Sequence, residues 1–420
     1  MRRQRPKINW FLVVLVVILI AIVTYVDRFV LPTAQTPFVP TPTATREAES
    51  YVTEAENLFD QGKLLEAIDT YREAIRIKPN DPSLYIALAR VQIFAGKYDD
   101  ALVNAEDSLL LNPNSSMAHA VHGWALTQKG EYTDADDALK SALELDPNNG
   151  LAHAYNAFLY GAMYENGVGP YADPIQTAID ESRLATTLTP NSLEAHWARA
   201  YVLQLTDNPE QAITEYQNAI AINNNISEIH LQLGVAYKAT QAIDKALQEY
   251  NLADTLNPTD YRPNLYSSRA LANIGEFSRA AQYAETAVGD DPTDPYLRGN
   301  WAYMLYKAND PASALEQFGL ALNGGETEDG QTVQALPPGG NETWSGNDTW
   351  ISIYYYTYDI ALAQDGRCSE VLTLTQTILD SFRNDEYAPY NAQYAQNLCT
   401  EGVGALSPQP SATPEPTPNP

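Results

Sequence analysis

Histidines are the side chains in this 420-residue chain that first suggest chemistry. There are five, and four of them, His119, His153, His196 and His230, recur in one register of a repeating pattern. His119 and His122 are three residues apart on one predicted helix, a spacing at which two imidazoles can share a metal ion. No third ligand recurs beside them, and a residue that recurs with a repeat serves that repeat. We therefore expect the four histidines to pack at the seams between repeats.

Other motifs that carry chemistry are weak or absent. Gly167 and Gly169 follow no predicted strand, so a longer turn explains them better than a phosphate-binding loop. The acids Glu326, Glu328 and Asp329 lack the spacing of a calcium-binding loop such as the EF-hand. The sequence has no Walker loop, no Gly-x-Ser-x-Gly and no His-Glu-x-x-His motif. We predict no catalytic residue, no cofactor and no metal site.

The elements that hold these residues follow a period of 34 residues. Each unit closes on a proline or, once, an asparagine: Pro79, Pro113, Pro147, Pro190, Asn224, Pro258 and Pro292. The third interval is 43 residues (190 − 147), so one unit carries nine extra residues (43 − 34). An alanine stands twelve positions before each closing residue, at Ala67, Ala101, Ala135, Ala178, Ala212, Ala246 and Ala280, and Ala314 continues the series. A second small residue follows seven positions later, at Ala74, Ser108, Ala142, Ala185, Ala219, Ala253, Ala287 and Ala321. A fixed period of this length indicates a solenoid.

Each unit predicts two helices. In the second unit the first helix ends at Gly96, where glycine permits the positive φ that a helix C-terminus often needs. The second helix carries Ala101 and Ser108 on one face, where small side chains allow two helix axes to approach closely. A following Asn-Pro or Asp-Pro ends it, because the residue before proline is disfavoured in the α region. Every unit is thus a helical hairpin.

This pattern resembles the tetratricopeptide repeat (TPR) family over residues 48–325. Repeat 116–149 has the family's glycine, aromatic, alanine, bulky apolar and proline residues at Gly123, Gly130, Tyr132, Ala135, Leu139, Ala142 and Pro147. Repeat 227–260 matches through Leu233, Gly234, Tyr237, Ala246, Tyr250, Ala253 and Pro258. The resemblance implies an all-α fold: a right-handed superhelical solenoid of eight helical hairpins, with the insertion at 165–174.

The N-terminus predicts a membrane anchor. Four basic residues at positions 2–7 precede an apolar run, 8–26, whose nineteen helical residues span about 28 Å, close to the thickness of a bilayer's hydrocarbon core. The basic flank favours a cytoplasmic N-terminus, with everything after residue 28 outside the cytoplasm. A cleaved signal peptide also begins this way, but the run is longer than its apolar region and no small-residue cleavage site follows. We expect a single uncleaved transmembrane helix within 1–28.

Charge and cysteines are consistent with that location. The chain has 25 basic and 53 acidic residues, a net charge of −28, which repels phosphate backbones and excludes nucleic acid as a partner. The two cysteines, Cys368 and Cys399, predict a disulfide in an oxidising compartment.

Four further segments complete the predicted organisation. Residues 29–47 and 404–420 are rich in proline and threonine and predict an extended linker and a disordered tail. Residues 326–350 interrupt the period and predict an irregular loop. Residues 351–403 predict a degenerate ninth hairpin and a capping helix stapled by the disulfide, covering the last face of the solenoid.

The concave face is the predicted binding surface. By the resemblance, the fifth, ninth, twelfth and thirteenth positions of each first helix point into it, and we expect a protein or peptide to bind Arg90, Phe94, Trp124, Phe158, Trp197, Tyr201, Lys238, Arg269, Tyr303 and Tyr306. Aromatic residues at helical spacing also commonly fill a core, so some of these side chains can instead belong to the inner layer.

These features together predict a membrane-anchored scaffold outside the cytoplasm, which mediates protein–protein interaction during assembly of an envelope complex and is not an enzyme. The alternative is a surface protein that binds cell-wall polymers or glycans, because exposed tryptophan and tyrosine rings also stack on sugars.

Overall fold

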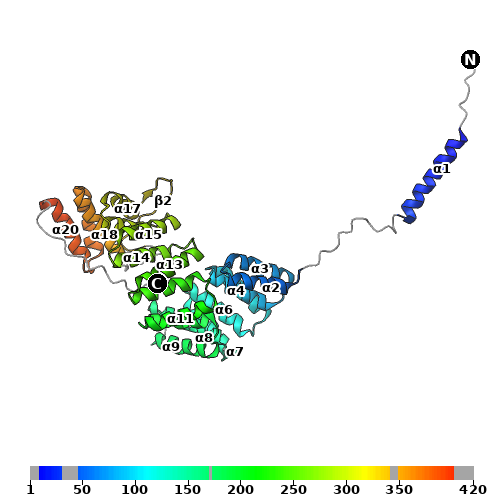
Figure 1. Ribbon diagram of the computed structural model, residues 1–420, viewed down its shortest axis with the longest axis horizontal. Helices are drawn as coiled ribbons and strands as arrows, with labels where there is room; N and C mark the ends of the chain where they lie inside the picture. The colour runs from blue at the N-terminus through cyan, green and yellow to red at the C-terminus, as the bar shows by residue number, and fades with distance from the viewer. Residues whose placement is uncertain (1–8, 31–45, 170–172, 341–348, 402–420) are drawn as a thin grey trace, which may run out of the picture.

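The computed structural model describes residues 9–30, 46–169, 173–340 and 349–401, and most of these residues are helical (Figure 1). The basic residues at positions 2–7, nearly all of the predicted 29–47 linker and the predicted 404–420 tail lie outside the described residues.

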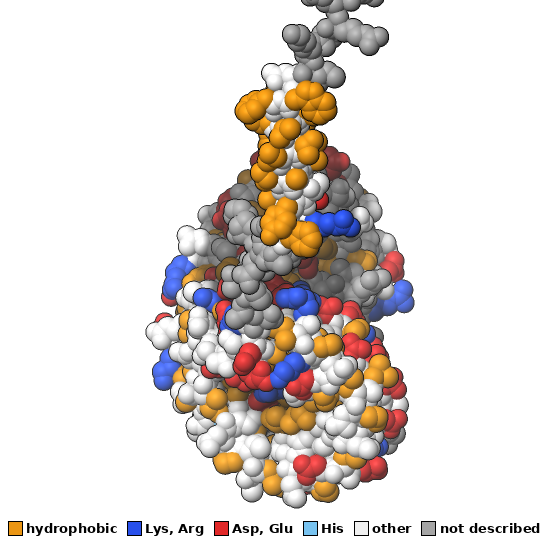
Figure 2. Space-filling model, turned by 90° about the vertical axis from the view of Figure 1, so that its right-hand side faces the viewer, with side chains coloured by type: hydrophobic (Ala, Val, Ile, Leu, Met, Phe, Trp, Pro, Cys, Tyr) orange, Lys and Arg blue, Asp and Glu red, His pale blue; other side chains and the backbone are white. Residues whose placement is uncertain are grey.

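The first helix, α1 (Trp10–Tyr25), continues into a π-helical turn, Val26–Val30. The segment Trp10–Phe29 is the one helix in the described ranges that is long and apolar enough to cross a membrane. None of the side chains of α1 is buried, and its hydrophobic side chains project from the helix in Figure 2. A helix this apolar and this uncovered is suited to a lipid environment.

Eight helical hairpins follow. They are α2 (Ala48–Asp60) and α3 (Leu64–Ile77), α4 (Pro82–Phe94) and α5 (Tyr98–Leu111), α6 (Ser116–Gln128) and α7 (Tyr132–Leu145), α8 (Gly150–Glu165) and α9 (Pro174–Leu188), α10 (Leu193–Leu205) and α11 (Pro209–Ile222), α12 (Ser227–Ala239) and α13 (Ile243–Leu256), α14 (Arg262–Asn273) and α15 (Phe277–Asp290), and α16 (Pro295–Lys307) and α17 (Pro311–Asn323).

Small residues allow the two helices of a hairpin to pack closely. All sixteen periodic alanine and serine positions are at most 1% exposed. Gly123 and Gly234 add a closer approach, because a Cβ on Gly234 would lie 2.4 Å from the Tyr250 ring and one on Gly123 would lie 2.6 Å from Leu139. The periodic small residues thus set the distance between helices, which follows the ridge-and-groove packing of α-helices.

The turn within each hairpin uses a left-handed residue. Glycine takes this position in the first three hairpins, as at Gly96 with φ 69°. Asp207, Gln241 and Asn309 take it in three later hairpins, with φ between 56° and 67°. The predicted turn at Gly96 is therefore one case of a rule that also holds where glycine is absent.

A short strand pair follows the eighth hairpin, where the sequence predicts only irregular chain. Strands β1 (Gly325–Glu326) and β2 (Thr332–Val333) pair antiparallel. Leu336, fully buried, donates its N–H to the Ala321 carbonyl at 2.8 Å, and its own carbonyl accepts from the Tyr355 hydroxyl at 2.7 Å. The buried side chains of Val333 and Leu336 hold this segment against α17 and the helix that follows.

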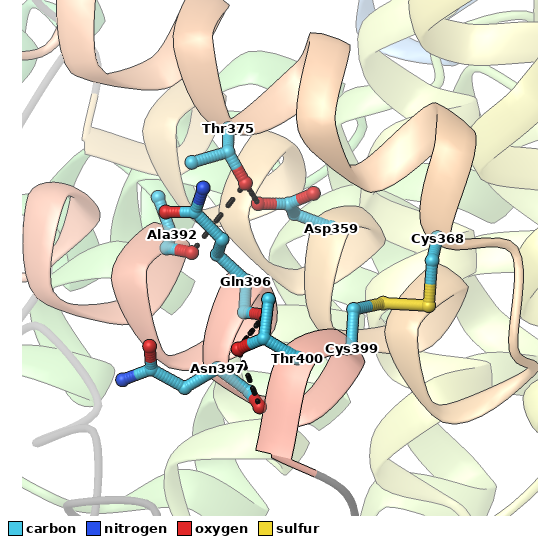
Figure 3. Close-up of a disulfide and its surroundings, with 8 residues drawn as sticks. All are labelled: Asp359, Cys368, Thr375, Ala392, Gln396, Asn397, Cys399 and Thr400. Carbon is cyan, nitrogen blue, oxygen red and sulfur yellow. Dashed lines mark hydrogen bonds between the residues drawn. A yellow bond between two sulfur atoms is a disulfide. The ribbon is translucent and has the colours of Figure 1, made fainter.

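The last three helices cover the end of the solenoid (Figure 1). They are α18 (Thr349–Gln364), α19 (Cys368–Ser381) and α20 (Ala388–Glu401). Figure 3 shows Cys368 at the start of α19 joined to Cys399 near the end of α20, with Cα atoms 5.6 Å apart. The tyrosine-rich helix α18 packs against α16 and α17, and Tyr354 lies where Gly299 leaves room for its ring.

Candidate functional site

The solenoid closes on itself after five hairpins. The side-chain amide of Asn225, in the α11–α12 turn, donates to the Asp60 carbonyl at 2.7 Å, and that of Asn223 donates to the Phe59 carbonyl at 3.3 Å. Gly62 lies so close that a Cβ would sit 2.5 Å from the Asn225 carbonyl oxygen. The first hairpin therefore rests on the turn between the fifth and sixth, more than 160 residues away in the chain, and we call this contact the closing seam.

Closure brings five predicted groove residues into one aromatic cluster. The ring of Phe94 lies 5.2 Å from that of Trp124 and 5.8 Å from that of Trp197. Phe158 continues the cluster, 5.0 Å from Trp197 and 5.7 Å from Tyr201. These rings interlock in edge-on and stacked arrangements, as aromatic residues do in a core.

Two members of this cluster are unavailable to a partner. Trp124 is fully buried and Phe158 is 5% exposed. Their prediction as binding residues is corrected: they fill the inner layer, because the superhelix is wound tightly enough for its concave face to pack against itself. Phe94, Trp197 and Tyr201 are half-buried at its margin. Trp124 and Phe158 are for the same reason unavailable for stacking on sugar rings.

Arg90, another predicted groove residue, forms an ion pair inside the superhelical turn that the first five hairpins close, which we call the closed turn. Its Nη2 donates to the carboxylate of Glu194 at the start of α10, which also accepts from the Ser192 hydroxyl at 3.1 Å. Burial alone would favour the protonated form of Glu194, but the Arg90 charge outweighs it and lowers the carboxyl pKa. The same charge pair raises the pKa of Arg90 against the effect of burial. Both groups are therefore ionised.

A cleft of about 510 Å³ opens beside this pair, at the closing seam. Its walls come from the end of α2, the inner face of α4, the start of α8 and the turns that precede α10 and follow α11. Its lining contains both apolar and polar residues, among them Phe59, Asp60, Arg90, Phe94, Leu193, Glu194, Ile222 and Asn223. Its volume falls within the range of ligand sites in proteins.

The remaining predicted groove residues lie in the second half of the solenoid, largely beneath α18. The guanidinium of Arg269 lies over the Trp350 ring, 4.6 Å from its centroid, and donates to the Tyr296 hydroxyl at 2.5 Å. Tyr303, 4% exposed, packs edge-on against Trp350, so its prediction as a binding residue is also corrected. The Tyr306 hydroxyl donates to Gln364 at 3.2 Å.

Lys238 is the inner-face cation of the sixth hairpin. Burial, and then the nearby Arg269, lower its ammonium pKa to about 8. No carboxylate within the described residues lies within ion-pair distance of it.

The four periodic histidines bond to the turn that precedes their own helix, and three of them also join the two helices of their hairpin. Three of them, His153, His196 and His230, place Nε2 against a main-chain carbonyl six residues earlier, at 2.9–3.0 Å. The Nδ1 atoms of the same three face Glu181, Glu215 and Glu249, at 2.5–2.7 Å. His119 makes the carbonyl contact, with Pro113. The predicted position at the seams between repeats is wrong, because the three glutamates lie on the second helix of the histidine's own hairpin. The contact is a polar clamp within the hairpin, where the sequence suggests aromatic packing. No group of three or more metal-ligating residues occurs in the described ranges.

Comparison with protein families identifies the repeat. Models described as TPR repeat and tetratricopeptide repeat match residues 55–92, 86–150 and 227–260. Residues 55–150 and 227–260 of this chain are therefore tetratricopeptide repeats. The predicted family and the predicted all-α solenoid are confirmed. The stacking of TPR hairpins accounts for the spacing of the small residues and the shape of each hairpin.

Known relatives of this TPR protein are partial matches. The type IV pilus assembly protein PilF of Pseudomonas aeruginosa is 27% identical over 163 residues, which cover 37% of this chain and 60% of PilF. The chain thus matches less than two thirds of that relative's length. Among solved structures, a thermophilic TPR protein of Thermus thermophilus is 22% identical, with a TM-score of 0.39 over 46% of this chain and all of the other. PilW, a type IV pilus biogenesis factor, is 15% identical, with a TM-score of 0.43 over 49% of this chain and 90% of PilW.

Sequence reasoning missed the closing seam and the partner of Arg90. The signal at the seam is Asn223-Asn224-Asn225, in which Asn224 takes the position that a closing proline holds in other repeats. The two donors, the side-chain amides of Asn223 and Asn225, lie on either side of the position that proline holds in other repeats. Glu194 offers no comparable signal, because acids are abundant throughout this chain.

Proposed function

We propose that this TPR protein is a membrane-anchored scaffold outside the cytoplasm that binds a protein partner during assembly of an envelope complex. The observation that carries the proposal is an array of TPR hairpins preceded by an exposed apolar helix of membrane-spanning length. TPR arrays serve mainly as surfaces for other proteins, and the description of PilF as a type IV pilus assembly protein supports a role in assembly.

The orientation rests on the basic residues at positions 2–7, which favour a cytoplasmic N-terminus. We propose that Trp10–Phe29 spans the bilayer and that no catalytic step occurs on the chain. Binding is assigned to the inner surface that remains open, beside Arg90 and Phe94, and not to the buried rings of Trp124 and Phe158.

Fractionation and protection test the anchor together. Full-length chain should resist alkaline carbonate extraction from membranes, and a variant that begins at residue 31 should be released. Protease added outside intact cytoplasmic membranes should digest the repeats. Carbonate-soluble full-length chain, or repeats protected until the membrane is broken, would contradict the proposed location.

Crosslinking in intact membranes tests the scaffold role. Full-length chain should capture one or more defined envelope proteins, identified by mass spectrometry, in amounts that exceed those captured by α1 alone fused to an unrelated domain. Capture of isolated wall polysaccharide in place of any protein would contradict the proposal.

A further inference from the structure

The cleft at the closing seam has walls that select one kind of ligand, and this inference rests on the proposed function. Its apolar side chains come from opposite walls, Phe59 and Phe94 from the first two hairpins and Leu193 and Ile222 from the fifth. Ile222 is 45% exposed although it is a large aliphatic residue at the rim. Apolar surface left open inside a cleft is the usual composition of a binding site.

Charge in the cleft is nearly balanced. The Arg90 guanidinium is matched by Glu194, and Asp60 adds one carboxylate at the edge. An acidic ligand would meet Asp60 and an already neutralised arginine, and a basic ligand would have only Asp60 to pair with. The lining therefore favours an uncharged occupant in a chain whose surface is otherwise strongly acidic.

Arg90 also has donor capacity to spare. Its side chain is 36% exposed, its Nη2 donates to Glu194, and its buried Nε–H has no acceptor among the described residues. A guanidinium has five N–H donors, so the exposed part can donate to a main-chain carbonyl of a ligand without losing the ion pair.

We propose that this cleft binds a short, extended, uncharged apolar segment of the protein partner, one of whose main-chain carbonyls accepts a hydrogen bond from Arg90. An aliphatic or aromatic side chain of the segment fills the space between Phe94 and Ile222. Because the walls belong to the first, second, fourth and fifth hairpins, the bound segment bridges the closing seam and stabilises the closed superhelical turn.

Peptide selection on the full-length chain in detergent micelles tests this proposal. The probe is a phage-displayed library of random twelve-residue peptides. The test variant is Ile222→Asp, which places a charge at the rim of the cleft. Its matched control is Leu252→Asp on α13, which makes the same change at a residue of similar exposure, 40%, outside the cleft.

Enriched peptides should carry an uncharged apolar core and bind the wild-type chain and Leu252→Asp equally. Ile222→Asp should bind them at least about tenfold more weakly, the loss expected when one apolar contact is replaced by a charge. Thermal unfolding midpoints of the two variants should agree, so that misfolding is not the cause. Tryptophan fluorescence should change on binding, since Trp197 packs on Phe94.

Three results would overturn the proposal: no enrichment on the wild-type chain, enrichment of charged peptides, or binding that Ile222→Asp leaves unchanged. The proposed function fails separately. If crosslinked membranes yield a defined partner whose capture is insensitive to Ile222→Asp, the scaffold role stands and the assignment of the cleft is wrong.

Discussion

Two buried carboxylates, one in the closed N-terminal turn and one in the C-terminal cap, show how the same helical fold treats charge in opposite ways. Glu194 is 3% exposed and accepts hydrogen bonds from Arg90 and Ser192, which hold its pKa below the usual range against the effect of burial. Asp359, on α18, is fully buried and accepts at Oδ2 from the Thr375 hydroxyl at 2.7 Å (Figure 3). Its Oδ1 has no partner among the described residues.

Burial consequently raises the pKa of Asp359 to about 7, and the hydrogen bond from Thr375 opposes this only in part. Both carboxyl groups are buried, so the difference in their charge state comes from the cationic partner, Arg90, that only Glu194 has. The closed turn contains a fixed ion pair, and the cap contains an acid that ionises near neutral pH.

Removing the partner of Glu194 should give the largest loss of stability. Arg90→Met leaves an unpaired carboxylate in the interior, and we expect the free energy of unfolding to fall by about 3–5 kcal/mol. Urea denaturation measures this at pH 7. Arg76→Met is the control, because Arg76 pairs with Glu73 on the surface and its loss should cost less than about 1 kcal/mol. Equal losses at the two sites would show that Arg90 holds no buried charge.

Asp359→Asn should remove pH dependence from the cap. A carboxyl whose folded-state pKa is raised stabilises the fold fully below about pH 4, and this stability is lost as pH rises through 7. The difference corresponds to roughly 4 kcal/mol. The variant should therefore match the wild type at pH 4 and exceed it at pH 8 in thermal unfolding. Asp365→Asn, an exposed acid on the following turn, should change neither value. The same decline with pH in Asp359→Asn would rule out this residue as its source.

The disulfide crosslinks the C-terminal cap and does not involve the closed turn. Replacing both Cys368 and Cys399 by serine frees a crosslink across 31 residues, which the loop-entropy model values at roughly 3–4 kcal/mol. Amide hydrogen exchange should rise across α18–α20 and stay unchanged in the closed turn at α4 and α10. Faster exchange in both regions would show that the cap and the closed turn unfold together.

The histidine clamps should give the smallest effect. Hydrogen bonds to Glu215 raise the pKa of His196 despite burial, and burial of His153 is likewise outweighed by its bonds to Glu181 and Pro147. A raised histidine pKa gives stability that is present below about pH 6.5 and lost as pH rises. His196→Gln should cost about 1–2 kcal/mol at pH 6 and less at pH 9. Glu215→Gln should reproduce this pattern, and additive losses in the double variant would argue against a direct pair.

Local features of this fold are predictable from the sequence, because they repeat. The buried alanines, the left-handed turn at Gly96 and the helix ends before proline each depend on a few neighbouring residues. The strand pair after α17 was missed since it consists of only two residues on each strand and depends on Leu336 finding a site on α17 and α18.

The candidate site was predicted only in part, for a geometric reason. Register placed Arg90, Phe94 and Trp124 on the inner face, and the structure brings them together. Whether an inner face is open or filled depends on the pitch of the superhelix, which accumulates over many hairpins and leaves no local pattern. Trp124 and Phe158 were therefore predicted as exposed, although the rings of later hairpins cover them.

The closing seam also determines where a mechanical load would act. The polypeptide enters the solenoid at α2, and the end of that helix is held to the α11–α12 turn by the amides of Asn223 and Asn225. Tension applied through the N-terminal segment would reach these two hydrogen bonds before it reached the later hairpins. Pulling would thus separate the first hairpin from the α11–α12 turn and widen the cleft. Force would therefore weaken ligand binding, and a bound ligand would resist the separation.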